Sequence, residues 1–311
     1  MQSPHPSDRS NDVTTRNQEP AAKRLRTLLA RPGIRIAPAV HDCLGALVAE
    51  QAGFDLIFSG GFGISASRLG LPDLGYLTAT EMIDAARAIA RATRLPVIAD
   101  MDTGYGNPLN VARTVMEAVA AGVAGIILED QAWPKRCGHM EGKQVIDPAE
   151  HVEKIAAARH AAGDSDLVIV ARTDARAIHG LEDALKRGER YLAAGADLLF
   201  VEAPRSRDEL ECIARHFPGH HLFANIIEGG KTPNLSAREL ETMGYKVVVF
   251  ALSGLFAATE ALQNCFAHLK HFGTTEGLAH RMDFAGFEKV IGLDRHRALE
   301  KKLMPRSDTS C

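Results

Sequence analysis

Titratable side chains are unusually dense between residues 129 and 139. The segment combines two carboxylates, two cations, a thiol and an imidazole, namely Glu129, Asp130, Lys135, Arg136, Cys137 and His139. A thiol flanked by cations lies in a positive field, which favours the thiolate and moves its pKa towards neutrality. Carboxylates are ligands for hard cations. The segment therefore predicts a metal beside a tuned proton donor, two requirements of an enzyme that handles enolates.

The remaining cysteines have a simpler interpretation. Cys43, Cys212 and Cys265 lie in helical stretches, where cysteine acts as a small buried hydrophobic residue. Cys137 lies instead in a polar loop beside Gly138, and glycines there would let the loop close over a ligand. Five cysteines without a close pair form neither a disulfide framework nor a zinc motif. Reduced thiols and a cytoplasmic location are expected.

Two aspartates indicate where a metal would bind. Asp100 and Asp102 are two apart on an expected strand, so their side chains share one face and repel unless a cation lies between them. With Glu129 on the next strand they predict an oxygen-rich site for Mg²⁺ or Mn²⁺. In the alternative interpretation Asp102 caps the turn at Gly104, and Asp100 pairs with Arg172.

A second set of residues is suited to binding anions. Ser59, Gly60 and Gly61 present backbone N–H groups with little side-chain obstruction, which suits a carboxylate or an oxyanion. A tight turn is the alternative. Arg172 has the geometry of a bidentate carboxylate clamp. Its alternative role is a structural ion pair with Glu202.

The rest of the chain alternates short apolar runs with amphipathic stretches. Strands are expected at 34–40, 56–59, 96–100, 125–129, 167–172, 197–202, 221–225 and 246–252. Helices are expected at 80–94, 108–121, 148–162, 181–194 and 236–243, with start signals at Thr80, Asn107 and Asp147. Eight such units in about 240 residues predict an α/β fold of the (β/α)8 TIM-barrel type. The alternative is an open doubly wound sheet, but the chain lacks the nucleotide-binding glycine motifs of that fold.

Most of the expected strands end on a polar residue. These residues are Ser59, Asp100, Glu129, Arg172, Glu202 and Asn225. The carboxyl ends of barrel strands meet on one face, where catalytic residues of such barrels lie. The pattern therefore predicts a single site built from these residues.

Composition and length restrict the classes of partner. The chain has 311 residues, 46% of them hydrophobic, and a net charge of −3, so a nucleic-acid partner is not expected. No secretory signal and no run of about 18 apolar residues is found, so no membrane span is expected. We expect a disordered tail at 1–22, a catalytic barrel at 23–270, a C-terminal helical arm at 271–304 and a loose tail at 305–311.

Several motifs together resemble a known group of enzymes. They are Ala52–Asp55, Ser59–Gly61, Leu71–Asp73, Asp100–Gly106, Glu129–Gln131, Lys135–His139, Ala171–Asp174 and Glu228–Pro233. In this order, over residues 23–300, they resemble the isocitrate lyase and phosphoenolpyruvate mutase superfamily. The likeness is greatest to its 2-methylisocitrate lyase, 2,3-dimethylmalate lyase (petal-death-like) and carboxyphosphonoenolpyruvate mutase-like branch.

The resemblance implies a Mg²⁺-dependent carbon–carbon lyase. Its substrate would be a 2-hydroxy dicarboxylate or tricarboxylate of the 2-methylisocitrate or 2-alkylmalate type, cleaved to an α-keto acid such as pyruvate and a second carboxylate. The implied catalytic residues are Cys137 as general acid, Lys135 and His139 tuning it, and Arg172 and Glu202. Substrate binding would involve Ser59, Gly60, Gly61, Asp73, Arg172 and Asn225, and the metal would lie at Asp100, Asp102 and Glu129. A last helix exchanged between subunits, within residues 282–303, would give dimers or tetramers.

One position departs from the pattern of the relatives. Ala251 follows the aromatic Phe250 at the end of the eighth expected strand, where many relatives have proline and oxaloacetate hydrolases are expected to have serine. The alternative activities are therefore oxaloacetate hydrolysis or decarboxylation, and carboxyvinyl-carboxyphosphonate phosphorylmutase. A barrel without catalysis, acting in binding or assembly, is a further alternative, disfavoured by the presence of Cys137 and the aspartates.

Overall fold

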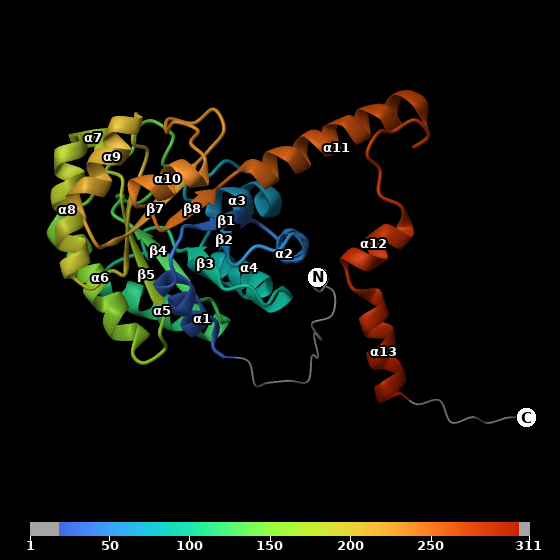
Figure 1. Ribbon diagram of the computed structural model, residues 1–311, viewed down its shortest axis with the longest axis horizontal. Coiled ribbons are helices and arrows are strands. Elements are labelled where there is room, and N and C mark those ends of the chain that lie inside the picture. Colours follow the sequence, from blue (N-terminus) through green and yellow to red (C-terminus); the bar gives the residue numbers. More distant parts are fainter. Residues whose placement is uncertain (1–18, 305–311) are drawn as a thin grey trace, which may run out of the picture. The chain divides into compact units, whose positions relative to one another are not determined.

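A computed structural model describes residues 19–304 of the chain, and within them eight parallel strands form a closed barrel in sequence order. The strands, shown in Figure 1, are β1 (Arg35–Val40), β2 (Ile57–Ser59), β3 (Val97–Asp100), β4 (Gly125–Glu129), β5 (Val168–Thr173), β6 (Leu198–Val201), β7 (His221–Ile226) and β8 (Val247–Phe250). Each lies within two residues of its expected bounds. The predicted TIM barrel is confirmed.

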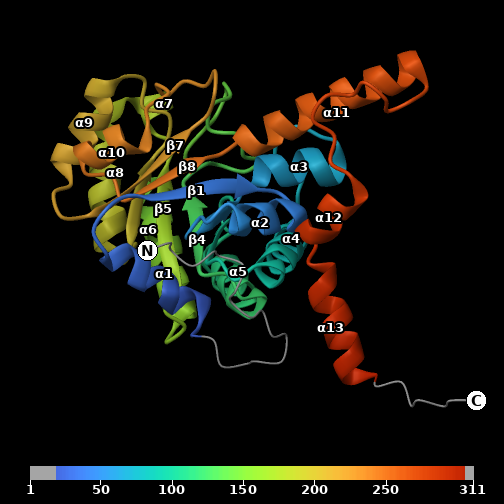
Figure 2. The same ribbon diagram turned by 45° about the vertical axis from the view of Figure 1, so that its right-hand side comes forward.

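Helices surround the strands in both ribbon views (Figures 1 and 2). They are α2 (Cys43–Gln51), α3 (Gly61–Leu69), α4 (Ala79–Ala92), α5 (Pro108–Ala121), α6 (Pro148–Ala162), α7 (Arg176–His179), α8 (Leu181–Ala193), α9 (Arg207–His216) and α10 (Ala237–Met243). Asn107 and Asp147 cap α5 and α6 as expected. The expected start at Thr80 is wrong, because Thr78, two residues earlier, forms a reciprocal capping box with Glu81.

Parallel pairing aligns the functional strand ends. Glu129 of β4 lies beside Arg172 of β5, which in turn lies beside Phe200 of β6. Asp100 of β3 lies beside Ile127 of β4. The expected polar residues therefore gather at the carboxyl face of the barrel.

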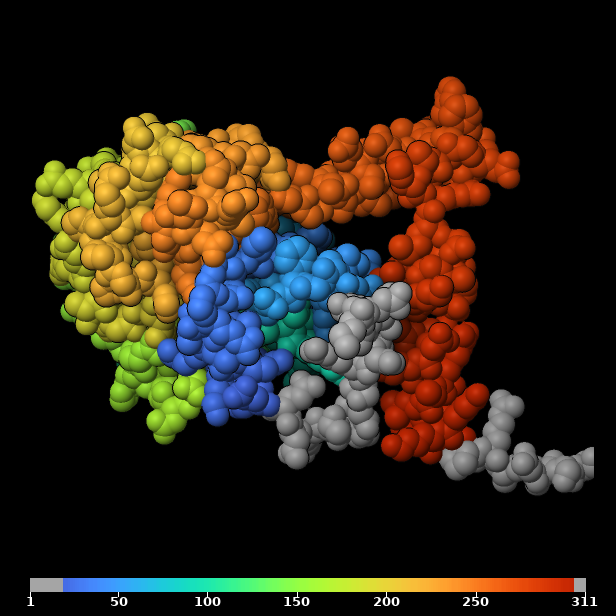
Figure 3. Space-filling model, viewed as in Figure 1, coloured from blue at the N-terminus to red at the C-terminus, as the bar shows by residue number. Residues whose placement is uncertain are grey.

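The first helix, α1 (Ala21–Ala30), lies at the opposite end of the barrel. Its Leu25 and Leu29 are buried in the cluster that fills the barrel interior. Arg26 binds the Leu167 carbonyl and lies 3.0 Å from the Asp197 carboxylate, near the amino ends of β5 and β6. Helix α1 is visible in blue at the surface in Figure 3. The tail expected at 1–22 therefore extends too far at Ala21, and residues 1–18 lie outside the described residues.

The chain divides into two compact units, the first ending at Phe256 and the second beginning at Ala257. This boundary falls within α11 (Ser253–Phe272), whereas the sequence suggests a boundary after residue 270. The second unit also contains α12 (Phe284–Val290) and α13 (Leu293–Leu303), and none of these helices contains a buried residue. Exchange of this arm between subunits stays a prediction, and the tail at 305–311 is outside the described residues. Within residues 19–304, no helix is long and apolar enough to cross a membrane.

A buried histidine predicts acid sensitivity of the fold. His151 in α6 is fully buried, with its ring edge-on to Tyr191 at 4.6 Å between centroids. Burial, followed by the charges of Lys154 and Arg187, lowers the pKa of His151 to about 3. An unfolded histidine has a pKa of about 6.5, so its stabilising effect is complete above that pH. It is lost as pH falls towards 3, because the unfolded chain takes up the proton first.

We therefore expect His151→Phe, which retains a ring without a titratable group, to flatten the acid side of the stability profile. The predicted difference in slope is about 1.4 kcal/mol per pH unit below pH 6.5. Urea unfolding of both proteins between pH 4.5 and 7.5 measures it. Equal slopes for the two proteins would contradict the assignment.

Candidate active site

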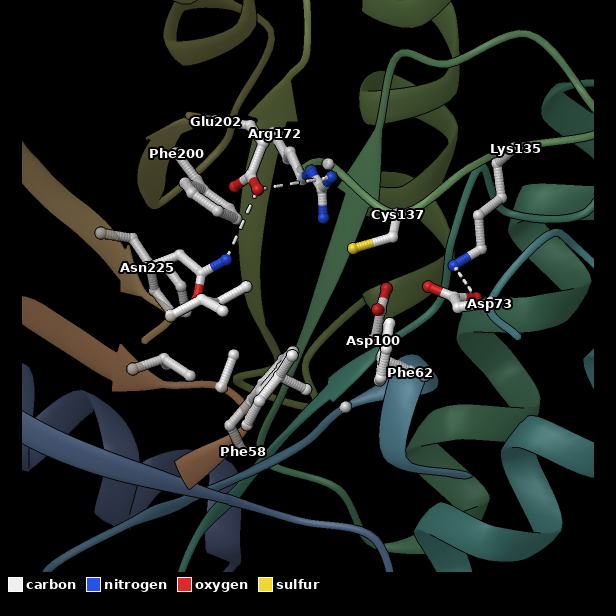
Figure 4. A pocket seen from close by; sticks show the side chains of 18 of the residues that line it. Phe58, Phe62, Asp73, Asp100, Lys135, Cys137, Arg172, Phe200, Glu202 and Asn225 are labelled. Atoms are coloured by element: carbon white, nitrogen blue, oxygen red, sulfur yellow. Dashed lines mark hydrogen bonds and ion pairs between the residues drawn. The ribbon is translucent and has the colours of Figure 1, made fainter. Parts of the chain in front are cut away.

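A cavity lies at the carboxyl face of the barrel. One part of its lining is polar and is contributed by Asp73, Asp100, Lys135, Cys137, Arg172, Glu202 and Asn225. The other part is apolar and includes Phe58, Phe200, Phe223, Ile227, Val249, Ala251 and Leu252. Figure 4 shows Cys137 between the Arg172–Glu202 group and the Asp73–Lys135 group.

The acidic side of the cavity is built around the Lys135 ammonium. Lys135 Nζ lies 2.6 Å from Asp73 Oδ1 and 2.7 Å from Asp102 Oδ1, with all three side chains buried. Asp100 Oδ1 accepts from the Asp102 N–H at 3.1 Å, and the Tyr105 hydroxyl donates to Asp102 Oδ2 at 3.1 Å. The alternative pairing of Asp100 with Arg172 is not found. Lys135, expected to act on Cys137, instead neutralises these carboxylates.

The buried carboxylates on this side of the cavity repel one another. Burial raises the pKa of Asp102 to about 6, an effect that Lys135 opposes and that Asp100 and Asp73 increase. Burial also raises the pKa of Glu129 well above its usual value, although Arg172 opposes this. A further cation beside these carboxylates would stabilise their charged forms. They can also take up a proton during a reaction.

The donor set fits a hard divalent cation. Glu129 Oε1 is buried and accepts no hydrogen bond from any described residue, so a carboxylate oxygen remains available. Among residues 19–304, however, no three histidine, cysteine, aspartate or glutamate side chains converge on one point. Mg²⁺ commonly binds through one or two carboxylates and fills its remaining positions with water and substrate. The residues present therefore fit such an ion without forming a protein cage.

The predicted anion-binding glycines begin a helix. Strand β2 ends at Ser59, Gly60 is the N-cap of α3, and Gly61 is its first residue. The first N–H groups of a helix lack partners within it and favour anions. A side chain at Gly61 would bring its Cβ to 3.2 Å from Asp100 Oδ2, so glycine permits the close packing of this turn against the carboxylates. Ser59 Oγ is buried without a partner among the described residues.

Arg172 is fixed chiefly by a residue that sequence reasoning did not select. Its Nε and Nη2 donate to the two oxygens of Asp174 at 2.8 and 3.1 Å. The Arg172 guanidinium lies 3.4 Å from Glu129 and 4.0 Å from Glu202. The alternative pairing with Glu202 is therefore the weaker contact. The guanidinium lies 5.3 Å from the centre of the Phe200 ring. The signal for Asp174 was its position directly after the Arg172 strand end.

Glu202 and Asn225 complete this side of the cavity. Asn225 Nδ2 donates to Glu202 Oε1 at 3.4 Å, as Figure 4 shows. Glu202 Oε2 and Asn225 Oδ1 are buried and have no hydrogen-bond partner among the described residues. These polar atoms, together with Arg172, are therefore available to a ligand.

The expected thiolate character of Cys137 is wrong. Burial raises the pKa of Cys137 to about 11, and Asp73 and Glu202 add to the rise, while the backbone at His139 and the Arg172 charge oppose it. The cationic neighbours in sequence do not create the expected field, because Lys135 pairs with aspartates and Arg136 is exposed. The thiol is therefore protonated at neutral pH, which is the state that donates a proton.

His139 connects two loops. Its Nδ1 accepts from the Lys231 N–H at 2.9 Å, so the proton of the neutral ring is on Nε2, which lies 3.2 Å from Glu202 Oε1. Lys231 belongs to the Glu228–Pro233 motif noted in the sequence. A Cβ at Gly230 would lie 2.6 Å from His139 Nδ1, so glycine is required for this approach.

The other cysteines are not the buried residues that were expected. Cys43 is exposed, and Cys212 and Cys265 are partly exposed. Each lies in a helix, as predicted, and Cys212 is partly buried against a core cluster of the barrel. None of them lines the cavity.

Comparison with known proteins identifies the family. The family model described as phosphoenolpyruvate phosphomutase matches residues 25–270. The carboxyvinyl-carboxyphosphonate phosphorylmutase of Arabidopsis thaliana is 46% identical, with 96% of this chain and 90% of the relative covered. The 2,3-dimethylmalate lyase of Eubacterium barkeri is 44% identical, with 90% of this chain and 96% of the relative covered.

Solved structures agree with this assignment. A crystal structure of a 2,3-dimethylmalate lyase superposes with a TM-score of 0.88 at 37% identity, covering 94% of this chain and 99% of that one. A phosphonopyruvate hydrolase in complex with oxalate and Mg²⁺ superposes with a TM-score of 0.83 at 30% identity, covering 91% and 99%. The chain thus belongs to the phosphoenolpyruvate phosphomutase family and is a carbon–carbon lyase of the isocitrate lyase and phosphoenolpyruvate mutase superfamily.

Proposed function

We propose that this enzyme cleaves the C2–C3 bond of a 2-hydroxy dicarboxylate bearing an alkyl substituent, of the 2-alkylmalate type. The products are an α-keto acid and a second carboxylate. The observation that carries the proposal is the position of Cys137, a protonated thiol directed into a cavity with an acidic side, a cationic side and an apolar wall. This arrangement supplies a proton donor between two sites for oxygen atoms.

The two ends of the substrate would bind different parts of the cavity. The α-carboxylate and the C2 hydroxyl would lie at the first turn of α3, beside Asp100 and Asp102. The second carboxylate would bind the Arg172 guanidinium, with Asn225 as a further hydrogen-bond partner. Asp73 and Lys135 act here by fixing the charge and position of Asp102. Two-point binding holds the C2–C3 bond in place and lowers the entropic part of the barrier.

Cleavage requires one proton to leave the substrate and one to be added. The hydroxyl proton passes to a carboxylate on the acidic side of the cavity. The C2 oxygen becomes a carbonyl oxygen as the C2–C3 bond breaks. The electron pair of that bond remains on C3 and is delocalised into the second carboxylate as an enolate. Arg172 stabilises the charge that develops there. Cys137 then donates its thiol proton to C3.

We propose Mg²⁺ as the cofactor, with Mn²⁺ as a substitute. Asp100, Asp102 and Glu129 would hold it, some of them through water. When bound, the ion would polarise the oxygens at C1 and C2 of the substrate and stabilise negative charge on them. The buried Glu129 Oε1 without a hydrogen-bond donor supports this site, as does the similarity to a phosphonopyruvate hydrolase that binds Mg²⁺ and oxalate.

The cavity favours an alkyl substituent over a third carboxylate. Of the three cations that line it, Lys135 is paired with Asp73 and Asp102, and Arg172 is paired with Asp174. The third, Arg136, is exposed. Burying an unpaired carboxylate against the phenylalanine wall would cost several kcal/mol. A methyl or ethyl group gains about 0.8 kcal/mol per buried carbon there.

A substrate panel with Mg²⁺ tests the proposal. We expect 2,3-dimethylmalate and 2-ethylmalate to release an α-keto acid with a higher kcat/KM than 2-methylisocitrate. Oxaloacetate is included, because hydrolysis would give acetate and oxalate instead. Oxalate and acetate as the only products of the panel would reject the lyase assignment. Preference for 2-methylisocitrate would reject the alkyl assignment alone.

The quaternary structure and location stay proposals. We propose a homo-oligomer, a dimer or tetramer, because the described helices of the C-terminal unit expose large apolar residues such as Phe266, Phe272 and Phe284. Light scattering gives the molar mass in solution, and a monomer would contradict this. A cytoplasmic location remains a prediction from the cysteine content.

A further inference from the structure

The Cys137 loop, residues 131–146, joins β4 to α6 and closes on itself at its base. Gln131 pairs with Val145 in an isolated antiparallel bridge. The Gln131 side chain also donates to the Arg136 carbonyl at 2.8 Å and accepts from the Arg136 N–H at 2.9 Å. These contacts define the base of the loop. They leave open how the segment around Cys137 is held against the barrel.

Lys143 makes the buried connection between this segment and the barrel. Its Nζ donates to the Gly138 carbonyl and to Asp174 Oδ1, the latter at 2.9 Å. The side chain of Lys143 is 2% exposed, and that of Asp174 is fully buried. Loop lysines are ordinarily solvated, since burying an ammonium is costly unless it is paired. One ammonium therefore ties the main chain next to Cys137 to the end of β5.

Asp174 is itself fixed from behind. Its N–H donates to Asp130 Oδ1 at 2.9 Å, and the neighbouring Thr173 hydroxyl donates to Asp130 Oδ2 at 2.7 Å. Tyr191 and Arg187 also donate to Asp130 Oδ2, at 2.8 and 3.1 Å. Asp174 thus accepts hydrogen bonds from both Arg172 and Lys143. Its own position is fixed by the hydrogen bonds around Asp130. Any loop position set by Lys143 is consequently set relative to the Arg172 guanidinium.

Gly138 shows how close the loop comes to the site. A Cβ at this residue would lie 2.1 Å from Glu202 Oε1 and 2.5 Å from Arg172 Nη2, so the main chain rests directly on both groups. Cys137 is the preceding residue, and its N–H donates to the Asp73 carbonyl at 3.2 Å. By binding the Gly138 carbonyl, Lys143 therefore fixes the main chain next to Cys137 and with it the position of the thiol at the cavity.

We propose that Lys143 is a positioning residue for the Cys137 thiol, and that its ion pair with Asp174 holds the loop closed over the bound substrate. The proposal rests on the proposed function in that a positioned thiol matters for proton transfer. Lys143 does not itself line the cavity and acts through Gly138, which does, and through Asp174. Its loss is expected to shift the loop towards open conformations.

The test compares Lys143→Met with Glu141→Gln in the full-length protein. Methionine keeps the length and apolar stem of lysine but cannot bind Asp174. Glu141 lies in the same loop and pairs with Lys231, but it is highly exposed, so its pair contributes little. With 2,3-dimethylmalate we expect Lys143→Met to lower kcat by about 100-fold, with KM within about threefold, because the strand-end residues still bind substrate. Glu141→Gln should change kcat by less than about threefold.

A second readout needs no substrate. Iodoacetamide modification of Cys137, followed by peptide mass mapping to separate it from the other cysteines, reports how often the loop opens. We expect Lys143→Met to accelerate it by about tenfold or more, since the partly buried thiol becomes more accessible when the loop opens. Lys143→Arg, which retains a cation for Asp174, should recover most of the wild-type protection. Thermal unfolding checks that each variant is folded.

The two readouts separate the two ideas. Faster Cys137 modification in Lys143→Met supports the positioning role even if no member of the substrate panel is cleaved, in which case the proposed function alone has failed. Unchanged modification overturns the positioning role, whether or not kcat falls. Equal acceleration in Glu141→Gln would also overturn it, because loosening would then not depend on the buried ion pair.

Discussion

Replacing Cys137 with serine is expected to lower kcat for 2-alkylmalate cleavage by about 1,000-fold, within the range of a positioned general acid. The hydroxyl of serine is nearly the same size as the thiol, but it is a far weaker acid. In the folded enzyme the thiol is protonated at neutral pH, because burial raises its pKa to about 11. The variant should therefore bind substrate but protonate the enolate slowly, so that KM changes less than kcat.

Cys212→Ser is the matched control for this variant. Cys212 lies in α9, is partly exposed and does not line the cavity, so its replacement should leave kcat unchanged. Circular dichroism and thermal unfolding should show both variants folded. Wild-type turnover by Cys137→Ser would remove the thiol from the mechanism.

Removal of divalent metal is expected to reduce turnover to below about 1% of the initial rate, and Mg²⁺ or Mn²⁺ should restore it. The physical reason is the buried acidic side of the cavity, where Asp102 and Glu129 have raised pKa values and Glu129 Oε1 accepts no hydrogen bond from a described residue. A cation relieves this repulsion, so it also stabilises the fold by binding the native state.

The stabilisation gives a readout that does not depend on activity. After treatment with EDTA and desalting, added Mg²⁺ should raise the melting temperature of the wild type. It should do so much less for Asp102→Asn, which lacks the proposed ligand charge. Full turnover in a chelated sample, or equal melting shifts for both proteins, would be inconsistent with the metal site.

The barrel was predictable because its signals are local. A buried parallel strand covered by helices is a short apolar run, and a helix start shows in residues such as Asn107 and Asp147. The placement of site residues at strand ends follows from the closed topology alone. The helix start at Thr78 shows the limit, since Thr78 and Thr80 are only two residues apart and only Thr78 has the three-residue spacing to Glu81 that a capping box requires.

The protonation state of Cys137 could not be read from its neighbours in sequence. It depends on where Lys135 points, and that is decided by Asp73, which lies between α3 and α4, and by Asp102, which follows β3. Both cations adjoin the thiol in sequence, but Lys135 is neutralised by the two aspartates and Arg136 is exposed. Burial then determines the direction of the pKa shift.

Lys143 had no sequence signal at all. A lysine in a glycine-containing polar loop is ordinarily solvent-exposed, and its burial results from a partner on the next strand, Asp174. Asp174 had a partial signal, since it follows Arg172 and Thr173 at a strand end. Both residues act through tertiary contacts that span the chain, which local patterns do not encode.

The most direct test of the central claim is the release of an α-keto acid from 2,3-dimethylmalate by purified enzyme with Mg²⁺. We expect pyruvate and propionate in equal amounts, with release that depends on Cys137. No α-keto acid from any 2-alkylmalate, together with acetate and oxalate from oxaloacetate, would contradict it.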